Sequence, residues 1–270
     1  MSLKQYQVDA FTHHAFKGNP AAVVVSHRPL ADALMRDMAA ENNLSETAYV
    51  YPDGDAWNIR WFTPTVEVDL CGHATLASAW VLATEYGLLE KEPDGVDIVF
   101  NSRSGELRVR VEGESITLDF PAQEVKAQAL PEVIAEGLGV NPNKAQCYKA
   151  QITNGNYIVI LPDEAAVAAL APDMSLLEQI QDGGIIATAE GVEADFVSRF
   201  FGPFYGIPED PVTGSAHCSL APYWARVLEQ NQLWARQISA RGGDLQCRVG
   251  GDRVFMTGRA VTVSETEWRL

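Results

Sequence analysis

The sequence predicts an α+β protein of two similar domains, each a β-barrel-like sheet wrapped around one central helix. Residues 71–79 read Cys-Gly-His-Ala-Thr-Leu-Ala-Ser-Ala, and residues 213–221, half a chain later, read Thr-Gly-Ser-Ala-His-Cys-Ser-Leu-Ala. Both segments open runs of small and apolar residues, which is typical of a helix buried on nearly every side. A repeat with so long a period indicates two like domains rather than a solenoid.

Two further pairs of motifs recur in the same order and support a duplication. Gly-Asn at residues 18–19 and again at 155–156 precedes an apolar run that reads as a strand. Arg-Trp-Phe-Thr-Pro at 60–64 is echoed by Arg-Phe-Phe-Gly-Pro at 199–203. Three repeats in register are unlikely to arise by chance, so we expect two copies of one domain. Their boundary is expected near Pro121.

The predicted domains are residues 1–120 and 121–270, with the last strands able to return to the first domain. In the first domain, apolar residues spaced by three and four predict a helix at 32–43, and an unbroken small, apolar run predicts the central helix at 71–86. Alternating patterns and β-branched runs predict the strands. These strands are 6–10, 21–25, 47–51, 57–62, 98–100, 107–111 and 116–120.

The second domain repeats this order. Helices are predicted at 130–138, 164–170 and 215–230, the last being the second central helix. Pro222 lies inside it, where a missing N–H suggests a bend or a late helix start. The predicted strands are 157–161, 184–188, 196–201, 248–249, 254–256 and 261–263.

Composition limits the classes of function. The chain has 270 residues, of which 47% are hydrophobic, and a formal net charge of −16. That charge excludes nucleic acid and anionic membranes as expected partners. The four cysteines have no CxxC spacing, the start lacks an apolar signal core, and no run is long enough to cross a bilayer. We therefore expect a cytoplasmic protein with reduced thiols.

The two central helices each begin with glycine, at Gly72 and Gly214. Free backbone N–H groups and the helix dipole make such helix starts sites for anions. Two of them facing one cleft between the domains would bind a carboxylate or a developing enolate. Alternatively, the glycines only allow close packing of helix and strand.

Several side chains could carry chemistry. His73, one residue into a helix, is either a packing residue or an acid/base. Glu46, between a helix and a strand, is either exposed and inert or a general base raised in pKa by its apolar flanks. Asp210 could cap a turn or bind substrate. Ser215 lacks the Gly-X-Ser-X-Gly context of a hydrolase nucleophile, and no histidine pair has metal-ligand spacing, so no metal site is expected.

Cys71 precedes the first central helix, and Thr213 stands at the matching position of the second. A thiolate at a helix N-terminus is activated, which raises the possibility of a cofactor-free racemase. That mechanism needs two opposed bases, and the partner position holds a hydroxyl. Cys71 therefore reads more simply as a small buried residue.

Four stretches together resemble one known family. They read Asp-Ala-Phe-Thr (9–12) with Gly-Asn-Pro-Ala (18–21), Leu-Ser-Glu-Thr-Ala (44–48), Asp-Leu-Cys-Gly-His-Ala-Thr (69–75) and Glu-Asp-Pro-Val-Thr-Gly-Ser-Ala (209–216). Their order and span are similar to those of the phenazine-biosynthesis PhzF-like family, which itself resembles diaminopimelate epimerase in fold. The pair of cysteines of that epimerase is not reproduced here.

The resemblance implies a cofactor-independent isomerase that transfers a proton on a small carboxylate-bearing metabolite in the cleft between the domains. It implies no cofactor and no metal, a small anionic substrate and a homodimer. By resemblance, Glu46 is the general acid/base, and His73 and Asp210 complete the catalytic set. The implied substrate-binding residues are Asn19, Gly72, Gly214 and Ser215.

Rival functions stay open at this point. An amino-acid racemase or epimerase would use Cys71, and a non-catalytic binder would bind the ligand without exchanging its protons. A hydrolase or lyase could share the same proton abstraction. The racemase predicts that Cys71→Ser abolishes activity and Glu46→Gln spares it, whereas the isomerase predicts the reverse.

Overall fold

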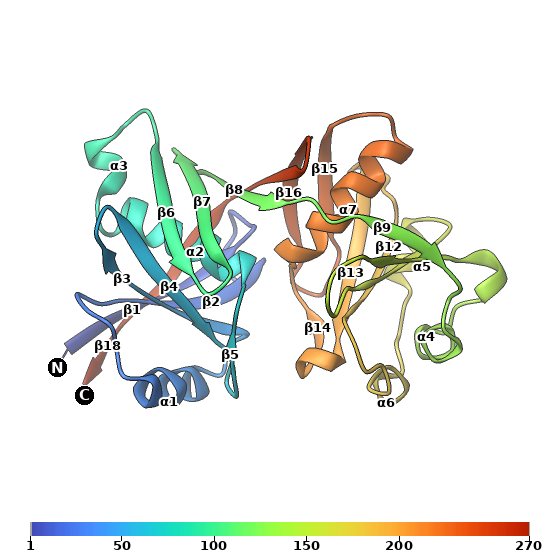
Figure 1. Cartoon of the computed structure of the whole chain (residues 1–270), viewed down its shortest axis with the longest axis horizontal. Helices are drawn as coiled ribbons and strands as arrows, with labels where there is room; N and C mark the ends of the chain where they lie inside the picture. The colour runs from blue at the N-terminus through green and yellow to red at the C-terminus, as the bar shows by residue number, and fades with distance from the viewer. Residues whose placement is uncertain (1, 270) are drawn as a thin grey trace. The chain divides into compact units, whose positions relative to one another are not determined.

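The computed structural model describes residues 2–269 and consists of two compact units. The first unit runs to Phe120 and resumes at Phe255, and the second is Pro121–Val254. The first unit therefore contains both ends of the chain. The terminal strands β1 (Ser2–Ala10) and β18 (Ala260–Arg269) pair antiparallel along their length, and Figure 1 shows them side by side.

The other elements of the first unit are mostly strands, with helices after β2 and β5. The strands are β2 (Asn19–Val25), β3 (Glu46–Asp53), β4 (Ala56–Phe62), β5 (Glu67–Val68), β6 (Val96–Ser102), β7 (Gly105–Glu112), β8 (Ser115–Pro121) and β17 (Arg253–Gly258). The helices are α1 (Asp32–Asn42), α2 (Gly72–Thr84) and α3 (Leu88–Lys91). The strands pair in the order β18–β1–β2–β3–β4–β6–β7–β8–β17, and the short β5 adds to β4.

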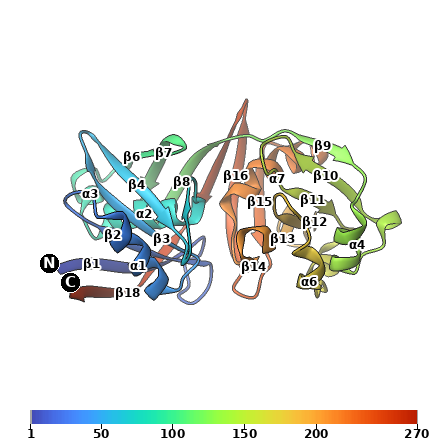
Figure 2. The same cartoon turned by 60° about the horizontal axis from the view of Figure 1, so that its bottom comes forward.

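Helix α2 forms the centre of this sheet. Every residue of α2 except Trp80 and Thr84 is buried, and the helix packs against β1, β2, β3, β7 and β18. Because these strands come from distant places in the pairing order, the sheet curves around the helix (Figure 2). The buried hydroxyls of Thr75 and Ser78 donate to carbonyls four residues earlier, at 2.5 and 2.7 Å, which satisfies them inside an apolar core.

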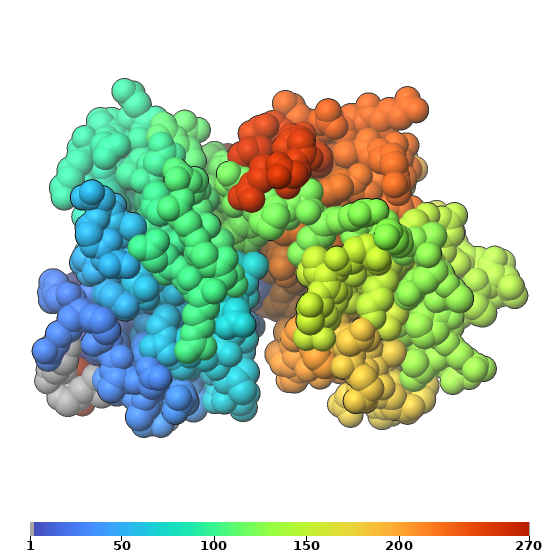
Figure 3. Space-filling view, in the orientation of Figure 1, coloured from blue at the N-terminus to red at the C-terminus, as the bar shows by residue number. Residues whose placement is uncertain are grey.

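Burial alternates along the strands that cover α2, as a half-buried strand requires. In β8 the side chains of Ile116, Leu118 and Phe120 point inward and are fully buried, while those between them are partly exposed. The space-filling view shows the outer face of the strands at the front of the first unit, among them β6 and β7 in green (Figure 3). This alternation is the pattern from which the strands were predicted.

The second unit has the same kinds of element. Its strands are β9 (Val125–Gln128), β10 (Gln146–Ala150), β11 (Tyr157–Ile160), β12 (Ile185–Glu190), β13 (Phe196–Gly202), β14 (Ile207–Asp210), β15 (Gln232–Gln237) and β16 (Gly243–Gly250). Its helices are α4 (Glu132–Leu138), α5 (Glu164–Ala168), α6 (Met174–Leu177) and α7 (Gly214–Val227), with 3-10 turns η1 (Pro142–Lys144) and η2 (Pro203–Tyr205).

The pairing of strands repeats from one unit to the other. In the first unit β2 pairs parallel with β3, and β4 pairs parallel with β6. In the second unit β11 pairs parallel with β12, and β13 pairs parallel with β15. The strands that link these parallel pairs are antiparallel in both units, β3 with β4 and β12 with β13. A short strand then adds at the same place, β5 to β4 and β14 to β13. The architecture is the predicted one of two similar sheets, each with a central helix.

The prediction of a late start in the second central helix is wrong. Helix α7 begins at Gly214 and runs through Pro222 to Val227. Proline has no N–H for the carbonyl four residues earlier, which here belongs to Cys218. The backbone N–H of Gln123 donates to that carbonyl at 2.8 Å, and Ser219 Oγ donates to Gln123 Oε1 at 2.8 Å. The Cys218 carbonyl, which has no helical partner because of Pro222, is thus hydrogen-bonded by the chain just after β8.

Candidate functional site

Glu46 and His73 lie against each other in the first unit. Glu46 is the first residue of β3, and His73 is the second residue of α2. Glu46 Oε2 and His73 Nε2 are 3.2 Å apart, with side chains 17% and 5% exposed. A carboxylate and an imidazole at this distance can share or pass a proton. Two residues that the sequence singled out as acid/base candidates are therefore in contact.

The other ring nitrogen of His73 has its own neighbours. Nδ1 lies 3.2 Å from Asn19 Nδ2 and 3.5 Å from Cys71 Sγ. The ring also hydrogen-bonds to the backbone of Pro20, which follows Asn19 in β2. Nε2 faces the Glu46 carboxylate. Asn19 and Pro20, at the start of β2, thus hold the ring with Nε2 toward Glu46.

Burial keeps His73 neutral. Its side chain is removed from water, which lowers its pKa to about 3 because the imidazolium loses its hydration. The contact with Glu46 is therefore between a carboxyl group and a neutral imidazole near pH 7. In this state His73 carries no positive charge.

Strand pairing explains why these residues meet. β2 and β3 are parallel, with Ala21 opposite Glu46. Parallel neighbours begin at the same edge of a sheet, so Asn19, the first residue of β2, and Glu46, the first of β3, share that edge. The first turn of the buried helix α2 packs at this edge and contributes His73.

The same group has to be tested as a metal centre. Within residues 2–269, Glu46, Cys71 and His73 are the one set of histidine, cysteine and acidic side chains whose ligand atoms all lie within 4.8 Å of one another. Their contacts fall on opposite ring nitrogens, with Cys71 at Nδ1 and Glu46 at Nε2. A metal ion binds one nitrogen of a histidine and would not lie along both contacts. The arrangement fits hydrogen bonding better than metal coordination.

In the second unit, Asp210 is held by a buried network. Thr213 Oγ1 donates to Asp210 Oδ2 at 2.5 Å, and Gln237 Nε2 donates to the Asp210 backbone carbonyl at 2.7 Å. Gln237 Oε1 also accepts from the Thr213 backbone N–H at 2.9 Å. Gln237 is fully buried at the end of β15. Sequence reasoning missed Gln237, because an isolated glutamine carries no motif.

Ser215 takes the place in α7 that His73 takes in α2, and it follows Gly214 at the helix start. Two residues on, His217 lies in the core, where its Nδ1 contacts the Thr213 carbonyl at 2.8 Å. Burial lowers the pKa of His217 to about 4. Thr75 makes the matching contact in α2, so His217 acts as a helix-terminus partner.

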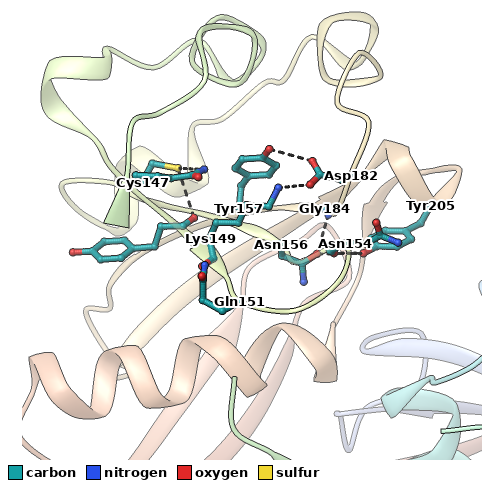
Figure 4. Close-up of polar contacts among 11 residues, drawn as sticks. Cys147, Lys149, Gln151, Asn154, Asn156, Tyr157, Asp182, Gly184 and Tyr205 are labelled. Carbon is teal, nitrogen blue, oxygen red and sulfur yellow. Dashed lines mark hydrogen bonds and ion pairs between the residues drawn. The ribbon is translucent and has the colours of Figure 1, made fainter. Parts of the chain in front are cut away.

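Asn156 is the counterpart of Asn19, and Figure 4 shows its surroundings. Asn156 Oδ1 accepts from the backbone N–H of Gly184 at 2.8 Å and from Tyr205 Oη at 3.4 Å. Near it, Lys149 forms an ion pair with Asp182, whose other oxygen accepts from Tyr157 Oη at 3.1 Å. Where Asn19 meets a histidine, Asn156 is fixed by a backbone amide. The two copies of the motif have diverged in chemistry.

The predicted site residues therefore fall into two groups. Asn19, Glu46, Gly72 and His73 belong to the first unit, where the three polar side chains form one cluster. Asp210, Gly214 and Ser215 belong to the second unit, at and just before the start of α7. Their roles toward a substrate stay predictions.

A sequence model of the family described as phenazine biosynthesis-like proteins (PhzC-PhzF) matches residues 8–266. The chain belongs to this family. An uncharacterized isomerase of Pseudomonas aeruginosa is 49% identical over the full length of both proteins. A phenazine biosynthesis-like domain-containing protein of mouse (Mus musculus) is 37% identical, with 98% of each chain covered.

Solved structures agree with this assignment. A PhzF family protein of Enterococcus faecalis superimposes with a TM-score of 0.93 at 43% identity, covering all of both chains. A probable proline racemase of Agrobacterium radiobacter is 12% identical with a TM-score of 0.68, covering 99% of this chain and 93% of that one, and shares the fold alone. The predicted family and fold class are confirmed, and the protein is a PhzF-like isomerase. No helix of residues 2–269 is long and apolar enough to span a membrane.

Proposed function

We propose that this PhzF-like protein is a cofactor-independent isomerase that moves a proton between two carbons of a small carboxylate-bearing metabolite. Glu46 is the general acid/base. The observation that carries the proposal is the 3.2 Å contact of the Glu46 carboxylate with the neutral, buried His73. A carboxylate positioned by a neutral hydrogen-bond donor can accept a proton and return it without any other change in the substrate.

The proposed reaction balances within the substrate and one carboxyl group. Glu46 takes a proton from a carbon that a neighbouring carboxylate or double bond makes acidic, and the C–H electron pair passes into the unsaturated system. Glu46 then delivers a proton to a different carbon, and this proton carries the solvent isotope whenever the carboxyl group has exchanged with water in between. No atom is gained or lost, so the product is an isomer.

His73 has a supporting role in this scheme. In the proposed tautomer, with the proton on Nε2 and Asn19 at Nδ1, His73 donates to the Glu46 carboxylate when that carboxylate is charged. Because its pKa is about 3, the histidine stays neutral over the working pH range. Proton transfer is therefore assigned to Glu46, and His73 keeps that group in place.

The remaining predicted residues are proposed as substrate ligands. We assign Asp210 and Ser215 to polar groups of the substrate, and the backbone N–H groups of Gly72 and Gly214 to its anionic part. Both glycines are the first residue of a central helix, where N–H groups are free to bind an anion. Local donors are needed, because a protein of net charge −16 repels anions overall.

One observation favours a second candidate. Cys71 Sγ lies 3.5 Å from His73 Nδ1 and could act as the base of an amino-acid racemase. Its counterpart, Thr213, instead donates its hydroxyl proton to Asp210. A two-base racemase would lack its second thiol here, so we rank this reaction below the isomerisation.

The deciding experiment is proton NMR in deuterium oxide with a pool of small carboxylic and amino acids. The isomerase predicts that one compound gains deuterium with the wild-type protein and with Cys71→Ser, and gains none with Glu46→Gln. Loss of exchange in Cys71→Ser alone would favour the racemase. A pooled compound that binds in calorimetry but never exchanges would identify a binding protein.

Light scattering after size exclusion tests the proposed homodimer.

A further inference from the structure

A closed network of neutral side chains joins the two ends of the segment that carries Glu46. Helix α1 ends at Asn42, β3 begins at Glu46, and Thr47 follows it in the strand. Asn42 Nδ2 donates to Thr47 Oγ1 at 2.9 Å. This hydrogen bond closes the connection 43–46 into a loop tied at both ends, with the catalytic carboxylate at its last position.

A second layer holds Asn42 in turn. Its amide pairs reciprocally with that of Gln5 on β1, with Gln5 Nε2 to Asn42 Oδ1 at 2.8 Å and Asn42 Nδ2 to Gln5 Oε1 at 3.0 Å. Gln5 Oε1 also accepts from Trp268 Nε1 on β18 at 2.8 Å. Gln5 is 7% exposed and Thr47 is 1% exposed. Buried polar groups joined in this way adopt one arrangement.

The direction of every bond in the network follows from Trp268. An indole N–H can only donate, so the Gln5 atom that it meets must be the oxygen. Asn42 must then present its NH₂ group to that oxygen, and its second proton is directed at the Thr47 hydroxyl. Neither amide can be turned over without placing two donors or two acceptors together. The loop therefore has one closed state.

Two observations connect this network to the reacting group rather than to stability alone. Asn43 adopts a left-handed backbone (φ 49°) as the C-cap of α1, so the connection reverses direction at its start. The backbone of Glu46 then pairs with β2, opposite Ala21, while its carboxylate lies 3.2 Å from His73 Nε2. The position of the Glu46 carboxylate therefore depends on the hydrogen bond that closes its loop.

We propose that Asn42 and Thr47 are positioning residues, which hold the Glu46 carboxylate against His73 through the hydrogen bond that closes the loop. The inference rests on the proposed function of Glu46. All members of the network are uncharged, so it acts through geometry. Misplacing a catalytic group by about 1 Å can cost about 100-fold in rate, and a freed loop gives scope for such a shift.

The test uses Thr47→Val, which keeps the shape of the side chain and removes the hydroxyl, with Thr47→Ser as the rescue variant. Asn42→Ala removes the other partner. Thr262→Val is the control, because it makes the same change elsewhere in the same unit, where the Thr262 hydroxyl accepts from Trp80 Nε1 at 3.1 Å and donates to Glu85 Oε1 at 3.3 Å. If both loop variants act through one bond, the double variant should behave like the single ones.

Two readouts are needed. Carbon-13 NMR of proteins labelled at the glutamate carboxyl carbon follows the titration of Glu46, whose signal is assigned by its absence in Glu46→Gln. We expect Thr47→Val and Asn42→Ala to move its midpoint by about half a pH unit or more, with Thr47→Ser and Thr262→Val unchanged. Deuterium exchange into the pooled acids should fall about tenfold or more in the first two variants alone.

The outcomes separate the inference from the function on which it rests. An unmoved Glu46 titration in Thr47→Val, with a melting temperature lowered as in Thr262→Val, would show a merely structural network and overturn the inference. Undiminished exchange in Glu46→Gln would instead overturn the proposed function. The titration would still decide whether Asn42 and Thr47 position Glu46, because it needs no substrate.

Discussion

Arg60 and Arg199 occupy the same place in the two units, and each makes the same two-point contact with a glutamate. Arg60 binds both oxygens of Glu67 on β5 at 2.7 and 2.8 Å, and Arg199 binds both oxygens of Glu209 on β14 at 2.8 and 2.9 Å. Each guanidinium also lies over a phenylalanine two residues on. The duplication has thus preserved a partly buried ion pair that ties the short strand before each central helix.

The first prediction concerns Arg199, whose side chain is 13% exposed. Arg199→Met leaves the Glu209 carboxylate without its two-point partner, and should lower the free energy of unfolding by about 2 kcal/mol. Urea denaturation measures the loss. Arg199→Met combined with Glu209→Leu should be less destabilised than Arg199→Met alone, because no charge is then left unpaired. Equal stability of all three proteins would contradict this reading of the pair.

The second prediction concerns Gly18, just before Asn19. Gly18 has φ +63°, and a Cβ added there would lie 2.1 Å from the Ala10 carbonyl oxygen. We expect Gly18→Ala to destabilise the first unit by more than about 2 kcal/mol, since both the backbone angle and the space exclude a side chain. Gly113→Ala is the control: it has a similar φ of +57° with nothing within 4 Å, and should cost about 1 kcal/mol. A smaller loss in Gly18→Ala than in Gly113→Ala would refute the steric argument.

The third prediction is a loss of stability in acid that the buried histidines cause. The pKa of His73 is lowered from 6.5 to about 3, and that of His217 from 6.5 to about 4, both by burial. Between these values and 6.5 the unfolded chain binds more protons than the folded one. Stability is therefore complete above pH 6.5 and falls as the pH drops, by up to about 1.4 kcal/mol per pH unit for each histidine.

Urea denaturation at several values between pH 7 and pH 4.5 tests this dependence. Replacing His217, which lies outside the Glu46 cluster, with glutamine should flatten the dependence by about half. An unchanged slope in His217→Gln would show that other groups cause the acid sensitivity.

The fourth prediction concerns Gln237, which no sequence motif indicated. It bonds to the Thr213 N–H and to the Asp210 carbonyl from a fully buried position. Gln237→Leu leaves both backbone groups unsatisfied and should cost about 2 to 4 kcal/mol. Gln237→Glu keeps an acceptor for Thr213 but loses the donor to Asp210. In thermal denaturation its melting temperature should lie between those of Gln237→Leu and the wild type. An unchanged melting temperature in Gln237→Leu would show that this network does not stabilise the region around Asp210.

Strand prediction worked where burial alternates and failed where strands are short or polar. β8 and β2 were found from their apolar residues, whereas β10, which reads Gln-Cys-Tyr-Lys-Ala, was missed. β14, which carries Asp210, was also missed, because its four residues have no pattern apart from pairing with β13. Such strands form because a neighbour offers hydrogen bonds, and a sequence window contains no information on that neighbour.

The candidate site shows the same division. Glu46 and His73 were selected as acid/base candidates from their local context and by resemblance, yet nothing in the sequence required them to touch. Their contact depends on the parallel pairing of β2 with β3 and on the start of α2 at the same edge. The neutrality of His73 likewise comes from burial, which a single residue in a sequence does not reveal.

By itself, the sequence determined the duplication, the two buried helices with glycine at their starts, the fold class and the family, because these depend on residue patterns that repeat along the chain. Only the tertiary structure decided which side chains meet: Asn19 with His73, Gln237 with Asp210, and Trp268 through Gln5 and Asn42 with Thr47. The physical reason is distance along the chain. Contacts between residues tens to hundreds of positions apart arise from the pairing order of strands and from packing around a central helix, and local sequence does not encode either directly.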